Sequence, residues 1–238
     1  MTDTCIFLQA RMTSRRLPGK SILKIAGFPL VVLAALRAGN TGIRVVVVTS
    51  TAPSDDILFD EVSAYGIECF RGNLDNVLLR FKEAADYYNL PKDGIIVRLT
   101  GDNVVPDGRL IDEFIGIFLN DSKIEYIGAN YPEDNLPYGI NAEIFKVLSL
   151  DGAFNNALTD HDLEHVTPWI KRHSNCSGLS PKIPKKDKLF VNSKLNLTID
   201  TYAEFEIMRD IFNKVSEPLD ESWFKICQIA LHNSQKSK

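Results

Sequence analysis

The stretch Cys5-Ile-Phe-Leu-Gln-Ala-Arg-Met-Thr-Ser-Arg-Arg-Leu-Pro-Gly-Lys20 decides how this chain is expected to fold. Its apolar start, Cys5–Leu8, predicts a buried strand, and the later apolar run Pro29–Leu36 predicts a helix. Between them, the segment Arg11–Lys20 carries four cations and a Pro-Gly pair that shapes a loop. Such a loop suits a polyanion such as a nucleoside triphosphate, because guanidinium groups bind phosphate oxygens in pairs and a lysine adds a mobile charge. A merely solvated basic loop is the alternative.

Strands and helices alternate through the rest of the first half. Further strands are predicted at 44–49, 67–70 and 94–99, with helices near 54–65, 75–88 and 106–119. This order predicts an α/β fold with a mixed, mostly parallel sheet flanked by helices. Ligands bind beyond the carboxyl ends of such strands, so the basic loop and Thr100-Gly-Asp102 are expected to face one pocket.

The second half has a less regular pattern. A strand is predicted at 125–130, a helical stretch at 160–173, an exposed loop at 181–188 and a strand-like segment at 195–199. Thr201 and Glu204 have capping-box spacing ahead of an amphipathic helix at 205–212.

Composition restricts the functional classes. The chain has 238 residues and a net charge of −4, which argues against general nucleic-acid binding. No apolar run approaches the roughly 20 residues that cross a bilayer, and the first residues lack a secretion signal, so a cytoplasmic protein without membrane contact is expected. The four cysteines are far apart, which disfavours a zinc ribbon or a redox pair.

The segment Gln9–Lys20 resembles the opening motif of the cytidylyltransferases that activate acidic and other unusual sugars, including ketodeoxyoctonate and acylneuraminates. The spore-coat polysaccharide branch is the most similar. Further segments fit the same branch in the same order: Phe70–Val77, Val97–Asn103, Pro137–Glu143, Glu164–Thr167 and Leu197–Asp200. The resemblance implies a nucleotide-diphospho-sugar transferase fold of Rossmann-like type. It also implies one domain over 1–238, with a nucleotide-binding half at 1–120 and an acceptor-binding half with a homodimer contact at 121–238.

The same resemblance assigns the nucleotide site. Arg11 and Lys20 would bind the triphosphate, and Asp102 and Asp200 would hold the metal; these four are the expected catalytic residues. The wider nucleotide-binding set is Gln9, Ala10, Arg11, Ser14, Arg15, Gly19, Lys20, Arg71, Thr100, Gly101 and Asp102. Arg71 either contacts the base or pairs with Asp75.

Elementary chemistry agrees with magnesium as the cofactor. Mg²⁺ takes oxygen ligands and commonly only one or two carboxylates, so two aspartates at strand ends suffice. Each aspartate also has a simpler interpretation: Asp102 could cap the next turn, and Asp200 could be a helix N-cap. Gly101 is expected to permit close approach of a phosphate.

The acceptor side is assigned by resemblance to Tyr138, Asn141, Glu143 and His165. Two positions depart from the pattern of the branch: Asn141 stands where aspartate is usual, and Leu163 where an arginine commonly precedes Glu-His-Val-Thr. Arg16 is expected to face solvent or the acceptor, and Arg98 to form an ion pair beside the site. Both departures leave the identity of the acceptor open.

The sequence therefore predicts a magnesium-dependent cytidylyltransferase that joins CTP to a small anionic, sugar-like acceptor and releases pyrophosphate. Use of another nucleoside triphosphate is one alternative, and a non-catalytic sugar-nucleotide sensor is another. A remote third is a zinc hydrolase, because His161, Glu164 and His165 fit the pattern His-x-x-Glu-His.

Overall fold

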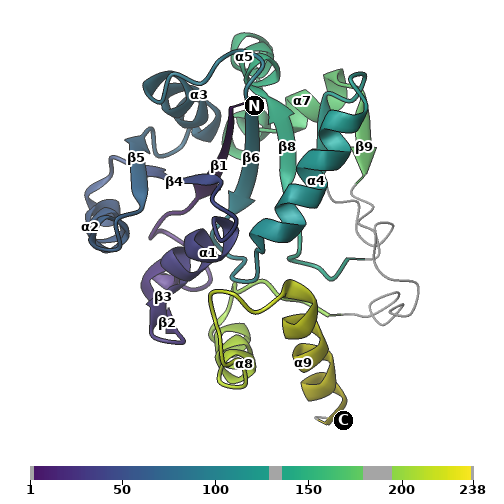
Figure 1. Ribbon diagram of the computed structural model, residues 1–238. Helices are drawn as coiled ribbons and strands as arrows, with labels where there is room; N and C mark the ends of the chain where they lie inside the picture. The colour runs from purple at the N-terminus through teal and green to yellow at the C-terminus, as the bar shows by residue number, and fades with distance from the viewer. Residues whose placement is uncertain (1–2, 129–135, 179–194, 237–238) are drawn as a thin grey trace.

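The computed structural model describes residues 3–128, 136–178 and 195–236. Within these residues the strands form a seven-stranded sheet in the order β5 (Glu68–Gly72), β4 (Arg44–Ser50), β1 (Thr4–Gln9), β6 (Ile95–Thr100), β8 (Glu143–Lys146), β7 (Tyr126–Gly128) and β9 (Cys176–Gly178). Strands β5, β4, β1 and β6 are parallel, whereas β8 runs antiparallel to both of its neighbours. The predicted mixed, mostly parallel α/β sheet is confirmed (Figure 1).

The helices of the first half lie where the alternation predicts them. They are α1 (Leu30–Ala38), α2 (Asp56–Ala64), α3 (Val77–Tyr87) and α4 (Gly108–Asn120). Helices α3 and α4 each have an N-cap side chain. Asn76 accepts a hydrogen bond from the N–H of Leu79, and Asp107 accepts one from the N–H of Arg109. Small elements join them, namely two 3₁₀ turns, η1 (Lys20–Ile22) and η2 (Pro53–Asp55), and a hairpin of β2 (Lys24–Ile25) and β3 (Phe28–Pro29).

The second half differs from the prediction in several places. Strand β8 and helices α5 (Val147–Asn156) and α9 (Trp223–Lys236) were not predicted. The helical stretch at 160–173 is two helices, α6 (Asp160–His165) and α7 (Pro168–His173), because Val166 has a φ of +69° and Pro168 starts the second helix. Segment 195–199 forms isolated bridges to Tyr138 and Asn103 rather than a strand of the sheet.

Two predicted segments reach beyond the described residues: the loop at 181–188 and the last two residues of the strand at 125–130. The capping box at Thr201 and Glu204 is confirmed, at the start of α8 (Tyr202–Phe212). No helix in the described parts of the chain has the length and apolarity needed to span a membrane.

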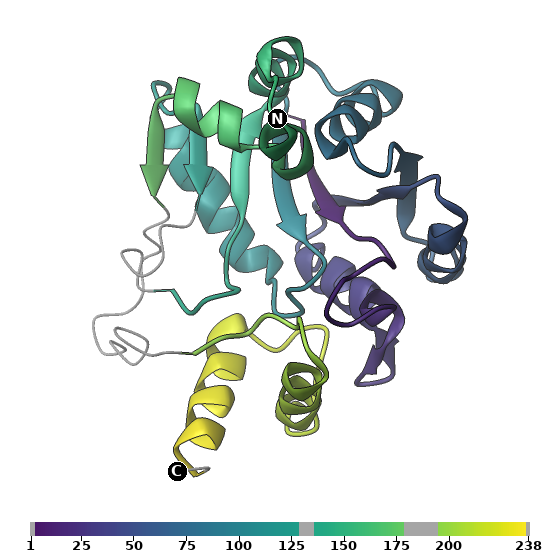
Figure 2. The same cartoon turned by 180° about the vertical axis from the view of Figure 1, so that it is seen from behind.

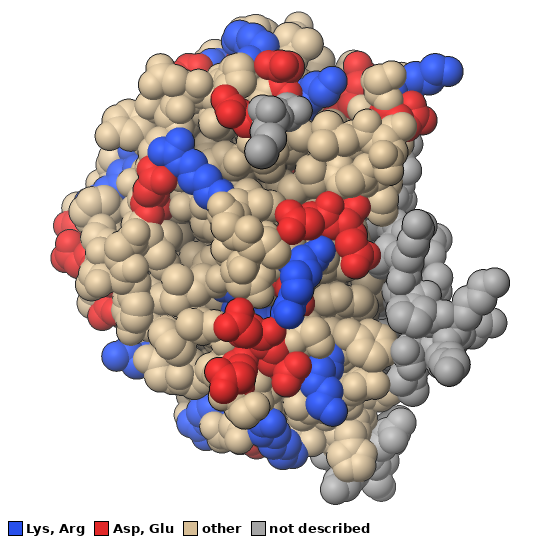
Figure 3. Space-filling model, in the orientation of Figure 1, with Lys and Arg blue, Asp and Glu red and all other residues tan. Residues whose placement is uncertain are grey.

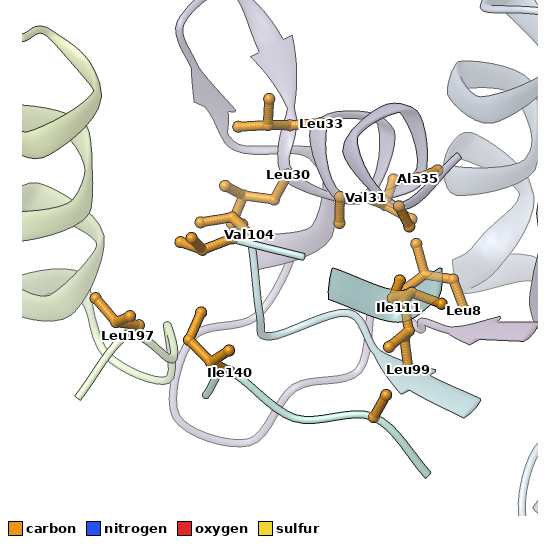
Figure 4. Packing of buried hydrophobic residues seen from close by; sticks show 14 of the residues in the cluster. Leu8, Leu30, Val31, Leu33, Ala35, Leu99, Val104, Ile111, Ile140 and Leu197 are labelled. Carbon is orange, nitrogen blue, oxygen red and sulfur yellow. The ribbon is translucent and has the colours of Figure 1, made fainter. Parts of the chain in front are cut away.

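The core lies on both faces of the sheet because strand side chains alternate. Cys5 and Phe7 of β1 pack under α3, α5 and α7, whereas Ile6 and Leu8 pack under α1 and α4. The cluster that holds Ile6 and Leu8 also includes Val104, Ile140 and Leu197, and Val104 lies against Leu30 of α1 (Figure 4). Helices α8 and α9 lie beyond the carboxyl ends of the parallel strands (Figure 2). On the face bearing α1 and α4, acidic and basic groups are interspersed (Figure 3).

Candidate functional site

A cavity of about 340 Å³ opens at the carboxyl ends of β1 and β6. The basic loop forms one side, and the first residue of α3 and the end of α6 form another. Most of the predicted site residues line it, and they come from four separate parts of the chain: Gln9, Ala10, Arg11, Ser14, Arg15, Lys20, Thr100, Gly101, Asp102, His165 and Asp200. Residues that the sequence places up to 191 positions apart thus meet at one opening, as the strand order predicts.

The basic loop is closed by its own backbone. The carbonyl oxygen of Met12 accepts hydrogen bonds from the N–H groups of Ser14 at 3.0 Å and of Gly19 at 2.9 Å. Gly19 has a φ of +74°, a conformation that glycine adopts without a steric penalty, and it starts the turn that carries Lys20. The loop therefore presents its cations from a defined backbone.

Asp200 is the anionic partner of this loop. One of its carboxylate oxygens lies 2.9 Å from Nζ of Lys20, and the other lies 2.8 Å from Nη2 of Arg16. The lysine also donates to the carbonyl oxygen of Ile199 at 2.7 Å. Asp200 is not the N-cap of α8, because Thr201 has that role.

Asp102 lies beside Asp200 through backbone pairing. The N–H of Ile199 donates to the carbonyl oxygen of Asp102 at 2.8 Å, next to the bridge between Asn103 and Thr198. Oδ1 of Asp102 is buried and has no hydrogen-bond partner among the described residues. Asp102 does not cap the following turn, since the side chain of Asn103 accepts from Val105 there.

These two carboxylates are suited to a hard cation. A buried carboxylate oxygen without a partner is costly unless something else binds it. A divalent cation with oxygen ligands would satisfy Oδ1 of Asp102 and take a second ligand from Asp200. The donor set present therefore fits magnesium.

Close packing around position 101 favours a glycine there, and the sequence alone does not reveal that packing. A Cβ atom there would lie 3.0 Å from both the Cβ of Ala10 and the carbonyl oxygen of Gln9. Its N–H donates to that same carbonyl oxygen at 2.8 Å. The glycine thus allows the ends of β1 and β6 to stay in contact below the cavity.

Arg98 forms the predicted ion pair, and its partner is Glu143. Nη2 of Arg98 also donates to Oε1 of Gln9 at 3.0 Å. The carboxylate of Glu143 further accepts from the hydroxyls of Tyr126 at 2.5 Å and Thr167 at 2.7 Å. Burial alone would raise the pKa of Glu143, but the charge of Arg98 and these hydrogen bonds outweigh it and lower the pKa. Glu143 lies behind Arg98 and does not line the cavity.

The other predicted acceptor residues have different positions. His165 lines the cavity, whereas Tyr138 and Asn141 are exposed on a segment that pairs with residues 195–197. The acceptor roles of Tyr138 and Asn141 stay predictions.

Arg71 does not pair with Asp75, the partner within the chain that was expected for it. Its guanidinium donates to the carbonyl oxygens of Ser50 at 2.9 Å and Ala52 at 3.3 Å, and it pairs with Asp56 at 2.5 Å rather than with Asp75. These contacts brace the turn after β4. A role in base binding stays a prediction.

A second cavity, of about 490 Å³, adjoins the first. The two share Arg11, Arg15 and Glu164, and Nη2 of Arg11 lies 3.7 Å from the carboxylate of Glu164. Leu163 and residues 74–76 complete much of its wall. The two cavities therefore lie on either side of a shared wall formed by these residues.

The pair His161 and His165 lies on one side of α6, with ring centroids 4.5 Å apart. Helix α6 ends at His165. Among the described residues, no group of three or more histidines, cysteines or carboxylates could hold a metal ion. The third ligand that the zinc-hydrolase alternative needs is therefore not found in the described part of the chain.

Five residues that line the cavity were not assigned to it from the sequence; one of them is Arg98, which was expected only to form an ion pair beside the site. Arg16 and Ser21 adjoin assigned residues of the basic loop, and Glu164 belongs to the motif that supplied His165. Val77 opens α3 and gave no chemical signal, because a valine there is typical of any packed helix start.

Comparison with known proteins adds independent findings. The chain matches the protein family described as Cytidylyltransferase over residues 5–235. It is 31% identical over 230 residues to the spore coat polysaccharide biosynthesis protein SpsF of Bacillus subtilis (strain 168), covering 93% of this chain and 91% of the relative. It is 28% identical over 167 residues to a 3-deoxy-manno-octulosonate cytidylyltransferase of Acidovorax sp. (strain JS42), covering 68% and 63%. The solved structure of a cytidylyltransferase from Leptospira borgpetersenii superposes with a TM-score of 0.87 at 25% identity, covering 99% of this chain and 96% of that one.

Proposed function

This chain belongs to the cytidylyltransferase family and is therefore a nucleotidyltransferase, and from that premise we propose that it activates a sugar acid or a related anionic acceptor with CTP and Mg²⁺. The acceptor oxygen attacks the α-phosphorus of CTP, the bond to the β-phosphate breaks, and pyrophosphate leaves. No nucleophile from the protein is required. A role in polysaccharide or glycan biosynthesis follows from the relatives and forms part of the proposal.

The observation that carries this proposal is Oδ1 of Asp102, which is buried without a hydrogen-bond partner among the described residues, on a residue that lines the same cavity as the cations of the basic loop. Arg11, Arg15 and Lys20 would hold the triphosphate, since each lines that cavity. Asp102 and Asp200 would hold magnesium. When bound, Mg²⁺ would neutralise charge on the α-phosphate and on the departing pyrophosphate.

Lys20 has a second task in this proposal. Its ammonium group is bonded to Asp200, so it can balance that carboxylate when no cation is present. From the same position it would stabilise charge that develops on the phosphates, a contribution of about 3 kcal/mol for one preorganised donor.

The test is a thermal-shift titration followed by a turnover assay. CTP with Mg²⁺ should raise the melting temperature, because a ligand that binds the folded state stabilises it by mass action. Lys20→Ala should lose most of that shift while its own melting temperature stays close to that of the wild type. Pyrophosphate release is then measured with CTP and a panel of sugar acids and sugar phosphates that includes 3-deoxy-manno-octulosonate.

The outcomes separate the alternatives. A larger shift with ATP, GTP or UTP than with CTP would change the nucleotide and keep the transferase. Nucleotide binding without pyrophosphate release from any acceptor would favour a sensor. Stabilisation by zinc and by no nucleotide would favour the hydrolase alternative. A homodimer and a cytoplasmic location stay predictions of the sequence, to be checked by light scattering and cell fractionation.

A further inference from the structure

One peptide unit of the basic loop is held at both of its ends. The carbonyl oxygen of Arg11 accepts a hydrogen bond from Oγ of Ser21 at 3.0 Å. The N–H of the same peptide, which belongs to Met12, donates to Oδ1 of Asp55 at 2.8 Å. Since a peptide unit is planar, fixing both of its polar groups fixes the plane that contains the Cα atom of Arg11 and restricts where its side chain can point.

Asp55 is an unusual anchor because it is a fully buried carboxylate. It ends the turn η2, on the far side of the loop from the solvent, and 43 residues separate it from Met12. Its other oxygen, Oδ2, accepts from the N–H of Ser50 at 3.3 Å, from the hydroxyl of Thr49 at 3.2 Å, and from the hydroxyl of Ser50.

The arrangement requires a carboxylate rather than an amide. Each oxygen of Asp55 accepts from one backbone N–H, and those of Met12 and Ser50 belong to different parts of the fold. An asparagine has one acceptor oxygen, so its NH₂ group would face one of the two N–H donors. A buried backbone donor facing another donor is costly, so one of the two contacts would be lost.

A negative charge directly beneath a loop that binds polyanions needs compensation. Arg80 of α3 is fully buried and lies within electrostatic range of Asp55. Burial lowers the pKa of the Arg80 guanidinium to about 10, and the charge of Asp55 acts in the opposite direction. Arg80 also donates to the carbonyl oxygen of Asn73 at 2.8 Å, which holds its guanidinium in the interior.

We propose that Asp55 is a positioning residue for triphosphate binding: by holding the Arg11–Met12 peptide from below, it aims the guanidinium of Arg11 into the cavity. This inference rests on the proposed function, in which the basic loop receives the triphosphate. It assigns to Asp55 a role through Arg11 and no contact with the ligand.

The test is a double-mutant cycle on binding of CTP with Mg²⁺ and of inorganic tripolyphosphate, both measured by calorimetry. Asp55→Asn should weaken both affinities by about tenfold or more, because misplacing a binding group by about 1 Å can cost up to a hundredfold. In an Arg11→Gln background the same substitution should change affinity by less than about twofold, because the group that it positions is gone. A general loss of stability would lower affinity equally in both backgrounds, and that result overturns the inference.

Two further variants complete the design. Thr49→Val removes a partner of Asp55 that does not touch the loop, and it should leave both affinities unchanged. If Asp55→Asn does not fold, as judged by circular dichroism, Ser21→Ala replaces it in the cycle, since Ser21 holds the other end of the peptide. Full affinity in a folded Asp55→Asn protein, or equal losses for Ser21→Ala in both backgrounds, overturns the inference and leaves the proposed function standing. Absence of binding by the wild type overturns both.

Discussion

Asp102 and Asp200 differ in what surrounds them, although the same role is proposed for both. Asp200 is neutralised by Lys20 and Arg16, whereas Oδ1 of Asp102 is buried without a partner among the described residues. The two positions therefore respond differently to the loss of a negative charge. The charge of Asp102 would bind the proposed cation, whereas the charge of Asp200 also forms ion pairs with Lys20 and Arg16 of the basic loop.

Asp102→Asn and Asp200→Asn should each reduce turnover severely and leave the protein folded. Asparagine keeps the size of the side chain and removes the charge that holds a hard cation. Activity is measured across a magnesium titration, because weakened metal binding is partly restored at high concentration. Asp200→Asn should in addition release Lys20 and Arg16, so it should bind tripolyphosphate without metal at least as tightly as the wild type does. A fully active Asp200→Asn enzyme with an unchanged magnesium requirement would leave Asp102 as the one carboxylate ligand.

Glu143 gives a prediction about acid stability. The pKa of Glu143 is lower in the folded protein than in the unfolded chain, where it is about 4.3. Its ionised carboxylate therefore contributes fully to the free energy of unfolding above the unfolded pKa, and this contribution is lost as the pH falls through the folded pKa. Glu143→Gln leaves the partly buried guanidinium of Arg98 without a counter-charge, which should cost up to about 3 kcal/mol at neutral pH. The measurement is urea unfolding of both proteins at neutral pH and at about pH 4. The difference in free energy of unfolding between the wild type and Glu143→Gln should be smaller at the acidic pH. If the difference is the same at both pH values, the ion pair with Arg98 does not cause it.

At the scale of an element, the start of α8 connects stability to the site. Glu204 of the capping box accepts from the N–H groups of both Thr201 and Asp200, each at 2.8 Å. The cap that begins the helix therefore also fixes the backbone of a proposed metal ligand. Thr201 and Glu204, the two residues of the capping box, therefore have different roles.

Thr201→Ala should lower the free energy of unfolding by about 1 kcal/mol, the usual cost of losing an N-cap side chain. Its effect on binding of CTP with Mg²⁺ should be small, because the N–H of Asp200 keeps its acceptor. Glu204→Ala should lower both the stability and the affinity for CTP with Mg²⁺. Thermal unfolding and calorimetry on the two variants test this, and equal losses of affinity would show that the cap acts on the site as a whole.

Elements also show where sequence reasoning was sufficient and where it was not. The strands of the main sheet and the α-helices of the first half follow from apolar runs of β-branched residues that alternate with helical patterns, and they were predicted correctly, whereas the β2–β3 hairpin was not predicted. Strand β8 has four residues, too few to show a period, and only its neighbours β6 and β7 define it. Helix α9 did show a period, since Trp223, Ile226, Cys227 and Ala230 have helical spacing, but it was not assigned.

The candidate site, too, could be predicted only in part. Motif residues at the ends of β1 and β6 meet as predicted, because parallel strands place their carboxyl ends together. The contacts of Arg71 with Asp56 and of Glu143 with Tyr126 and Thr167 depend on side-chain packing between distant segments. No spacing along the chain encodes those contacts. Asp55 was overlooked for the same reason.

At the scale of the whole molecule, the two halves of the chain share one core. The cluster that holds Ile6 and Leu8 also holds Ile226 and Ala230 near the far end of the chain. Arg37 of α1 is buried and donates to the carbonyl oxygens of Pro218 at 2.7 Å and Glu221 at 2.8 Å. The C-terminal segment is thereby fastened to a helix of the first half of the chain.

The order of strands has a consequence for the synthesis of this protein. Strand β7 precedes β8 along the chain but lies outside it in the sheet, so only β8 covers the edge of β6. While the ribosome adds the residues between 100 and 143, that edge of the nascent sheet has no native neighbour. An uncovered edge is a template for pairing with other chains, and at usual translation rates it persists for several seconds. Slow translation within this interval prolongs the exposure and favours aggregation, whereas a pause after β8 has left the ribosome and paired with β6 finds the edge already covered.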